Sequence, residues 1–469
     1  MDQGRPRRQR PATSRRFALA AMLAALGAGC AVQQPPADLS RSQVQGVPER
    51  FAAATDPAQP KGPVRDNWLG EFGDGRVLAM VEAAVTHNPD LAVAAARWEE
   101  ARARLRVAGS FLQPQIDAFG TAQRTDPGEL PIANRFDLGM QVSWEADLWG
   151  RLRSQEEAAR AAAQASGWQY EFARQSLAAA VVDAWFLAVT ARLQTAINQQ
   201  QVEAEQFTAK VTRDRIDVGA ASQLDLNVAE ANLALAEESL RQSQGALLEA
   251  QRALEILLGS YPSAAQTVAD VLPPLPPPPP VGLPSQLLER RPDLIAADRV
   301  VAAAFYGVES ARAARLPRVA LSASLGTLLD PTEEIWSIGA NLLAPVFTGG
   351  RLEGEVEIAT AQQRQALAQY VSVALRAFRE VESALSNEHV LAYRQTKLER
   401  ADEMLRSAST IADDRYNAGI LNILDLTQVR RQDFANRSQL LRVRAERLRQ
   451  RLNLHLALGG SFDTRETQP

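Results

Sequence analysis

Residues 215–226 read RIDVGAASQLDL, and residues 415–426 read RYNAGILNILDL. The arginine, the glycine and the final Leu-Asp-Leu triplet recur at a spacing of 200 residues. Farther out, Gly150-Arg151-Leu152 recurs as Gly350-Arg351-Leu352, whereas Pro89-Asp90-Leu91 recurs as Pro292-Asp293-Leu294 at a spacing of 203. Solenoid repeats are much shorter than this, so the chain is a duplication of one long unit.

The N-terminus has the composition of an export signal. Six arginines precede a short apolar run from Phe17 to Leu26, which is too short to span a bilayer as a helix. Cys30, the single cysteine, follows small residues at the position where a bacterial lipoprotein signal is cut, and we expect it to be lipidated. The alternatives are an ordinary signal with a stray cysteine, or twin-arginine export read from Arg15-Arg16.

Removing residues 1–29 takes away six arginines and one aspartate, so the formal net charge falls from −4 to −9. Such a chain lacks the basic surface that nucleic-acid binding needs. The sequence also shows no nucleophile paired with a base, no phosphate-binding glycine loop and no metal-ligand spacing. We therefore expect no enzyme activity, no cofactor, no metal site and no nucleic-acid partner.

Helical periodicity dominates each repeat. We expect two helices between Asp74 and Phe111, with Pro89 in the first turn of the second. No proline occurs from Gly150 to about Arg213, a span of roughly 95 Å as a helix. Ser222 can cap a helix that runs to Leu258. The second repeat predicts matching helices at 351–417 and 422–458, and rods of this length favour an elongated fold.

Between these helices the period changes to two. Phe136, Leu138, Met140, Val142 and Trp144 alternate with polar residues, which predicts a strand with one apolar face. Four strands are expected, at about 115–124, 135–145, 318–327 and 335–345, each long enough to cross a bilayer at a tilt. Near the strand ends stand the aromatic residues of a possible membrane belt: Trp144, Trp149, Trp336 and Phe347. The alternative is a soluble α+β fold with both hairpins packed on helices.

The expected organisation is therefore a signal peptide (1–29), a lipidated tether (30–66), repeat 1 (67–270), a proline-rich linker (271–284), repeat 2 (285–460) and a tail (461–469). Four strands cannot close a membrane barrel, which needs about eight. An open edge in lipid would leave backbone groups unpaired, so the chain must share its barrel with copies of itself. Two copies give eight strands and three give twelve; these considerations leave the choice open.

Several motifs resemble those of one family. They are Trp68 to Asp74, Asn88-Pro89-Asp90-Leu91, Trp144 to Arg151 and, most specific, GLPSQLLERRPDL at residues 282–294. Over 30–460 the chain resembles TolC-type outer-membrane efflux factors, most closely the NodT-like lipoproteins of tripartite RND efflux systems. This resemblance implies a homotrimer with a 12-strand β-barrel in outer-membrane lipid, continuous with a 12-helix α-barrel in the periplasm. It also implies a periplasmic adaptor and an inner-membrane RND transporter as partners, and small molecules, drugs or toxic compounds, as the cargo.

The same resemblance assigns roles to the two repeated turns. It implies that they dock the adaptor through Val218, Gly219, Ala220, Ser222, Ala418, Gly419, Ile420 and Asn422. It places Asp425 at a pore constriction, and Asp225 with Tyr416 in contacts that hold the tip closed. Leu421 and Gln428 depart from the arginine and second aspartate of some members, so we expect Leu421 and Leu424 to hold the gate by apolar contact. Metal-ion efflux, type I secretion and a non-pore periplasmic scaffold are the alternatives.

Overall fold

A computed structural model describes residues 32–54, 60, 62–72, 75–126, 128, 133–329 and 332–463. The chain divides into two compact units. The first, called the sheet unit here, contains Trp98–Ser166 and Ala297–Val371 with the segment up to Gln43. The second, the helical unit, contains Val44–Arg97, Gly167–Ala296 and the chain from Ser372 onward.

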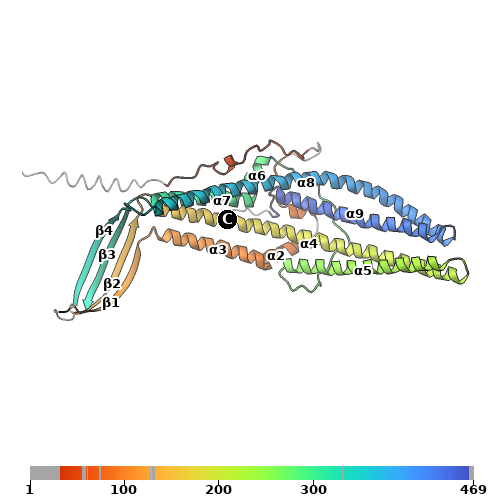
Figure 1. Cartoon of the computed structure of the whole chain (residues 1–469), viewed down its shortest axis with the longest axis horizontal. Helices are drawn as coiled ribbons and strands as arrows, with labels where there is room; N and C mark the ends of the chain where they lie inside the picture. Colours follow the sequence, from red (N-terminus) through yellow and green to blue (C-terminus); the bar gives the residue numbers. More distant parts are fainter. Residues whose placement is uncertain are drawn as a thin grey trace, which may run out of the picture. The chain divides into compact units, whose positions relative to one another are not determined.

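The sheet unit carries one antiparallel sheet of four strands in the order β1-β2-β3-β4 (Figure 1). The strands are β1 (Gln115–Thr125), β2 (Ala133–Ala146), β3 (Arg318–Leu329) and β4 (Thr332–Leu343). All four expected strands are present. β4 begins three residues before the expected start, because Glu333 and Glu334 interrupt the alternation without ending the backbone pairing with β3.

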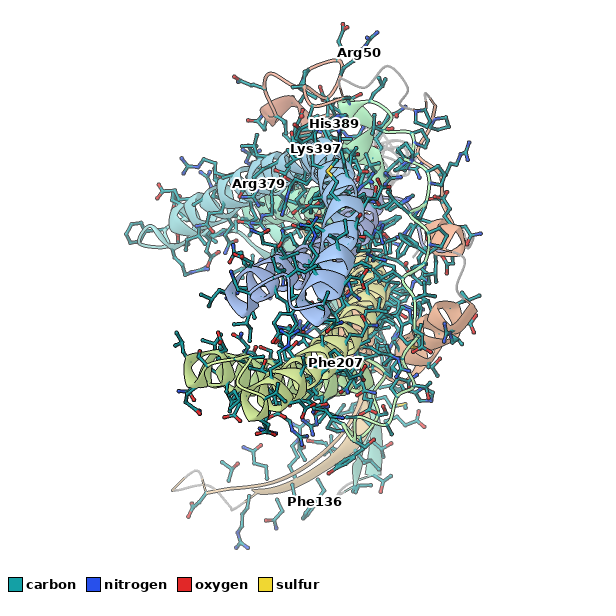
Figure 2. All side chains as sticks on the ribbon, turned by 90° about the vertical axis from the view of Figure 1, so that its right-hand side faces the viewer. Arg50, Phe136, Phe207, Arg379, His389 and Lys397 are labelled. Carbon is teal, nitrogen blue, oxygen red and sulfur yellow. The ribbon has the colours of Figure 1, made fainter. Side chains whose placement is uncertain are left out.

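The sheet has one apolar and one polar face, and the register aligns like with like. Met140 on β2 opposes Ala118 on β1 and Leu325 on β3, and Leu325 opposes Trp336 on β4. These apolar side chains are exposed in the single chain, as Figure 2 shows for Phe136. No helix of the sheet unit covers them among the described residues. The soluble alternative, with both hairpins packed on helices, is therefore wrong.

The two hairpins are copies of one another in register. Gln115 opposes Ser143 in the first, and Arg318 opposes Leu343 in the second. Arg318 stands 203 positions after Gln115, and Leu343 stands 200 positions after Ser143. The three-residue difference in repeat spacing therefore falls in the turn between the two strands. The strand pairing itself is preserved by the duplication.

Shorter helices precede each hairpin: α2 (Gly75–His87) and α3 (Pro89–Ser110) before β1, α6 (Pro284–Arg290) and α7 (Pro292–Ala313) before β3. Pro89 opens α3, as expected from its missing N–H. The Asn88 side chain accepts a hydrogen bond from Leu91 N (3.0 Å) and donates one to Leu257 O (3.0 Å). The break between α2 and α3 is thus fixed by one asparagine.

Each hairpin is followed by a long helix and an antiparallel shorter one, which lie side by side (Figure 1). In repeat 1 these are α4 (Arg151–Asp217, 67 residues) and α5 (Gln223–Leu257, 35 residues). In repeat 2 they are α8 (Arg351–Asn417) and α9 (Ile423–Ala457), with the same two lengths. Within the described residues, α4 alone contains a window apolar enough to span a bilayer as a helix, and 56% of that window is buried. We therefore read it as a core segment.

The core of the helical unit is built around α4. Trp185 and Phe186 are buried there together with Trp68 and Phe72, which come from a 3-10 turn ahead of α2. Trp68 donates from Nε1 to Gly460 O (3.1 Å), which joins the first ordered element of repeat 1 to the end of repeat 2.

The described part of the expected tether is more ordered than its composition indicates. Phe51 is buried, and Glu382 on α8 accepts hydrogen bonds from Ala52 N (2.7 Å) and Ala53 N (2.8 Å). Both contacts lie in the helical unit. Within this unit, Ala52 and Ala53 are therefore held against α8 by one carboxylate.

His455 makes stability depend on pH. Its ring is 1% exposed, and burial lowers its pKa to about 4, with the Arg451 charge as the second cause. The Glu71 carboxylate lies 3.5 Å from Nε2, yet neither ring nitrogen has a hydrogen-bond partner among the described residues. An unfolded histidine titrates near pH 6.5, so the unfolded chain takes up the proton first. Stability is full above pH 6.5 and is lost as the pH falls toward 4, by about 3 kcal/mol.

We expect His455→Gln to flatten this acid loss. Unfolding midpoints of the detergent-purified protein, measured from pH 7 to pH 4, should fall less steeply for the variant than for the parent. His87→Gln is the control, because His87 is exposed and bonds only to Ala83 O of its own helix. Identical slopes for the parent and His455→Gln would contradict the assignment.

Candidate functional site

The two helix-hairpin tips, residues 218–222 and 418–422, have the same backbone. Gly219 and Gly419 both lie at φ +74°, where a side chain would strain the turn. Ala220 N donates to Arg215 O (2.7 Å), and Ile420 N donates to Arg415 O (2.9 Å). A Cβ on either glycine would meet nothing within 4 Å. The glycines are therefore required by the left-handed backbone and not by close packing.

Both following helices are capped by the same pair of positions. Asp225 accepts hydrogen bonds from Ser222 N (2.8 Å) and Oγ (2.7 Å), which hold the pKa of that carboxyl below its usual value. Asp425 accepts from the Asn422 side-chain amide (2.7 Å), and Asp425 N donates back to Asn422 Oδ1 (2.8 Å). Both aspartates thus stabilise a helix N-terminus, and the Asp425 side chain is also exposed at the tip.

Aliphatic side chains project from both tips into solvent. Exposed fractions reach 77% for Val218, 67% for Leu224, 76% for Ile420 and 58% for Leu424. The other expected docking residues are exposed too: Gly219, Ala220, Ser222, Ala418, Gly419 and Asn422. Val218 and Ile420 lie on the turns, and Leu224 and Leu424 lie in the first turn of the helix that follows each. Together they form a surface suited to contact with another protein.

Tyr416 links the two hairpins beside the tips. Its ring is 4% exposed, and its hydroxyl shares a 2.8 Å hydrogen bond with Thr212 on α4. The Arg215 guanidinium lies 4.3 Å from the ring centroid and donates to Tyr416 O and to Asn417 O (3.3 Å). The expected partner, Asp225, instead bonds Ser222 within its own cap. Leu421 packs on the small cluster around Tyr416, whereas Leu424 points outward.

Arg430 forms a second link between the hairpins, and the sequence analysis did not predict it. Arg430 on α9 is 7% exposed and donates to Asp413 on α8 (2.8 Å) and to Ala204 O on α4 (3.0 Å). Beside it, Glu205 on α4 is 5% exposed, and burial raises the pKa of this carboxyl. Within the described chain Glu205 Oε2 has no hydrogen-bond partner. Arg430 therefore supplies the positive charge next to a buried acid and joins three helices.

A sequence signal for this link does exist. The pair Asp413–Arg430 stands 200 positions after Arg213–Glu230, so the duplication keeps the two positions and reverses the charges. Arg213 and Glu230 also form an ion pair, at 2.7 Å, but both side chains are about half exposed. Equal spacing with reversed sign indicates that each pair forms within its own hairpin. Burial of the second pair cannot be read from spacing.

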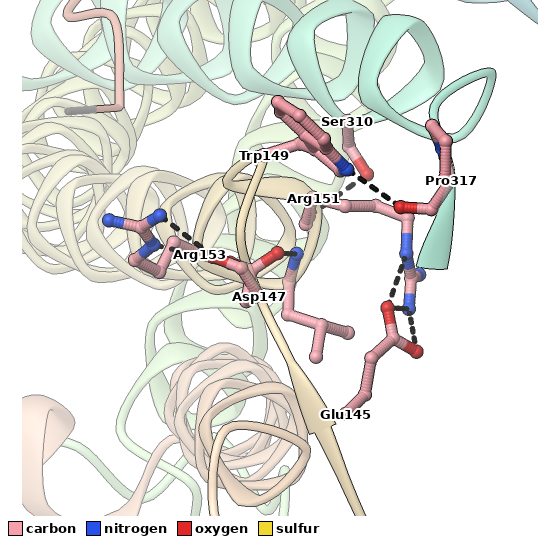
Figure 3. Close-up of polar contacts among 8 residues, drawn as sticks. Glu145, Asp147, Trp149, Arg151, Arg153, Ser310 and Pro317 are labelled. Atoms are coloured by element: carbon pink, nitrogen blue, oxygen red, sulfur yellow. Dashed lines mark hydrogen bonds and ion pairs between the residues drawn. The ribbon is translucent and has the colours of Figure 1, made fainter. Parts of the chain in front are cut away.

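At the other end of α4, polar contacts fix the passage from sheet to helix (Figure 3). Asp147 accepts from Leu152 N (3.1 Å) and Arg153 N (2.9 Å), and Arg151 pairs with Glu145 (2.8 Å). Two expected belt residues donate to carbonyls here: Trp149 Nε1 to Pro317 O (2.6 Å) and Trp144 Nε1 to Leu112 O (3.0 Å). The other two, Trp336 and Phe347, are 74% and 90% exposed.

No group of three or more His, Cys, Asp or Glu side chains suited to a metal occurs among the residues that the structure describes. Cys30 lies outside those residues.

Known proteins resemble the chain over nearly its whole length. The sequence profile of the family described as "Outer membrane efflux protein" matches residues 80–260 and 283–460. Outer membrane protein OprJ of Pseudomonas aeruginosa is 30% identical, with 95% of this chain and 96% of that protein covered. Cation efflux system protein CusC of Escherichia coli is 28% identical, with 84% and 88% covered.

Among solved structures, the outer-membrane channel OprN superposes with a TM-score of 0.85 at 28% identity, covering 92% of this chain and all of that one. The similarity confirms the predicted fold class, in which each chain supplies four strands and two long hairpins to a trimeric β-barrel continuous with an α-barrel. Two profile matches, one per repeat, together with these neighbours, show that the chain belongs to the outer membrane efflux protein family.

Proposed function

We propose that the chain is the exit channel of a tripartite efflux pump. Three copies conduct small molecules from an inner-membrane RND transporter across the periplasm and the outer membrane. The observation that carries this proposal is the sheet. Its apolar face is exposed, and its outer strands, β1 and β4, each have one edge that no other described strand pairs with. Lipid would cover such a face, and neighbouring copies would pair such edges.

The helices supply the periplasmic part of the route. α4 and α8 contain 67 residues each, which corresponds to roughly 100 Å. These two helices and the shorter α5 and α9, contributed by each of three copies, make a ring of twelve with a bore of roughly 25 Å, wide enough for small molecules. We propose conduction without catalysis as the role of this tube.

The tips divide into a docking surface and a gate. We propose that residues 218–222 and 418–422 dock the periplasmic adaptor, because their aliphatic side chains Val218 and Ile420 are exposed. We further propose that Asp425, Leu424 and Leu421 constrict the pore, with Asp225 and Tyr416 keeping the tip closed. Two contacts support the closing role proposed for Tyr416. Its buried hydroxyl shares a hydrogen bond with Thr212, and the Arg215 guanidinium lies over its ring.

The aromatic belt is proposed for the two tryptophans that stand on the apolar face of the strands, Trp144 and Trp336. Trp149 follows β2 and Phe347 follows β4. We propose that these two residues belong to the part of the belt on the helix side of the sheet. A side chain with an apolar ring and a polar N–H suits the interface between lipid and water.

Lipidation of Cys30 remains a prediction. If the thiol carries a diacylglycerol, intact-mass spectrometry of the membrane-extracted protein will show a mature chain that begins at Cys30 and is heavier by the lipid. Cys30→Ser is the control, and it should lose that added mass. A mature chain cut elsewhere, or an unmodified Cys30, would contradict the assignment.

Deletion of the gene tests the function. We expect the deletion strain to accumulate organic toxic compounds and to recover on complementation with the parent chain. Complementation with Ile420→Asp should fail although the variant reaches the membrane, because that side chain is exposed and unneeded for folding. Accumulation of metal ions alone would favour cation efflux, the activity named for CusC. Unchanged accumulation of both classes would contradict the proposal.

A further inference from the structure

Because the chain is duplicated, the pairing of β2 with β3 shows how β4 would pair with a strand that is missing from the described part of the single chain. β2 pairs with β3, and the segment after β2 is anchored there by the Trp149–Pro317 hydrogen bond. The segment after β4 has no such anchor among the described residues: Val346 is 96% exposed and Phe347 is 90% exposed. β4 corresponds to β2, and β1 corresponds to β3. The missing neighbour of β4 is therefore β1 of another copy.

The repeat offsets fix the register of that junction. In the chain, Met140 opposes Leu325 and Trp144 opposes Leu321. Moving β2 forward by 200 positions and β3 back by 203 converts these pairs into Ala340 with Ala122 and Ala344 with Ala118. We propose that β4 of one copy pairs with β1 of the next in this register, called the seam register here. The proposal rests on the three-copy channel proposed above.

The two faces of the sheet support this register. The seam register places Leu342, an apolar-face residue of β4, opposite Gly120, which lies on the apolar face of β1. A slip by one residue would place apolar side chains opposite polar ones along the whole seam. Slips by two residues keep the faces aligned, so a second observation must decide among the even registers.

Two apolar residues on the polar face of the sheet decide among the even registers. Leu343 stands on the polar face at the edge of β4, where it is 65% exposed. Phe119 stands on the polar face at the edge of β1, packed against Gly139. The seam register places Leu343 directly opposite Phe119. Slips by two residues would instead oppose Leu343 to Asp117 or to Thr121, and Phe119 to Asn341 or to Pro345. In both slips Leu343 loses its apolar partner, and the two large apolar side chains no longer meet.

The seam register also accounts for the exposed segment after β4. It brings Val346 opposite Ile116 of the next copy, and Ile116 is itself 66% exposed in the single chain. Two aliphatic side chains that face solvent in one chain thus cover each other in the assembly. The seam extends beyond Leu343, the last residue of β4, toward the helices.

Disulfide cross-linking in native membranes tests the register. Ala122→Cys is combined in turn with Ile338→Cys, Ala340→Cys and Leu342→Cys, followed by mild oxidation and non-reducing electrophoresis. Directly opposed residues reach disulfide geometry, whereas residues displaced by two positions lie about 7–8 Å apart, beyond the usual reach of a disulfide. We expect the Ala340 combination to link chains up to a trimer at least about tenfold more than the other two.

Controls separate the register from the assembly. Val142→Cys with Ala323→Cys, opposed within the chain, must form its internal disulfide and alter the mobility of the monomer. Single-cysteine variants show any contribution of Cys30. Preferential linking through Ile338 or Leu342 would overturn the seam register while leaving the three-copy channel intact. A formed internal control without links between chains would overturn both.

Discussion

Arg430→Ala is expected to loosen the tip end of the channel and to raise its conductance. The substitution leaves Asp413 without its partner and removes the first of the two cations near the buried Glu205, so that only Arg431 remains. Breaking a fully buried ion pair by removing one member costs about 3–5 kcal/mol. The Asp413 side chain is 36% exposed, so solvent screening places the expected cost below that range. The loss falls on the contacts that hold α9 to α4 and α8. Single-channel recordings in planar bilayers should therefore show larger or more frequent openings, with a lower unfolding midpoint.

The first repeat supplies a matched control. Arg213→Ala removes the cation at the position corresponding to Asp413, and its pair with Glu230 is about half exposed on both sides. Exposed pairs contribute about 0–1 kcal/mol, so conductance and midpoint should remain close to the parent. Arg430→Lys, which keeps the charge, should recover part of the parent behaviour. Equal effects of Arg430→Ala and Arg213→Ala would contradict a specific role for the buried pair.

Asp425→Asn is expected to weaken block of the channel by multivalent cations. If Asp425 lines the constriction, as proposed above, three copies place three of its carboxylates around one axis, and a cation there interacts with all of them. One pair of unit charges in contact contributes about 1 kcal/mol in water, so removal of three should weaken block at least about tenfold. Asparagine retains an oxygen for the Asn422 amide, so the cap is kept. The measurement is the cation concentration that halves the current.

Asp225→Asn is the control for this charge effect. Asp225 occupies the corresponding cap in the first repeat, and its carboxylate is bonded to Ser222. We expect it to leave the blocking cation concentration near the parent value, whereas the part proposed for Asp225 in keeping the tip closed would show separately, as more frequent openings. If Asp225→Asn weakens block as strongly as Asp425→Asn, the acidic ring at the constriction is not formed by Asp425 alone. Unchanged cation block in Asp425→Asn would contradict the proposal that three Asp425 carboxylates form an acidic ring in the pore.

Much of the fold could be predicted because it rests on local signals. Gly219 and Gly419 mark the turns through backbone geometry, and Ser222 and Asn422 mark the helix starts through capping bonds three residues away. Alternation from Phe136 to Trp144 marks β2, because one face of a strand needs a residue at every second position. Expected and observed helix ends agree closely for the same reason.

Contacts between distant helices could not be predicted in the same way. Arg430 becomes buried only because α4 brings Ala204 and Glu205 against α9, and no local pattern specifies that approach. Tyr416 was expected beside Asp225, yet its hydroxyl meets Thr212 on α4. In a helix a rotation of one residue changes which side chain faces a neighbour, so packing decides the partner.

The mass of the detergent-purified particle tests most directly whether the exposed sheet belongs to a shared membrane barrel. Native mass spectrometry of the full chain should give a particle of three chains that requires detergent to stay in solution. A monomer that remains soluble and folded in detergent-free buffer would contradict the account, because its apolar face and both strand edges would then need neither lipid nor a neighbouring copy.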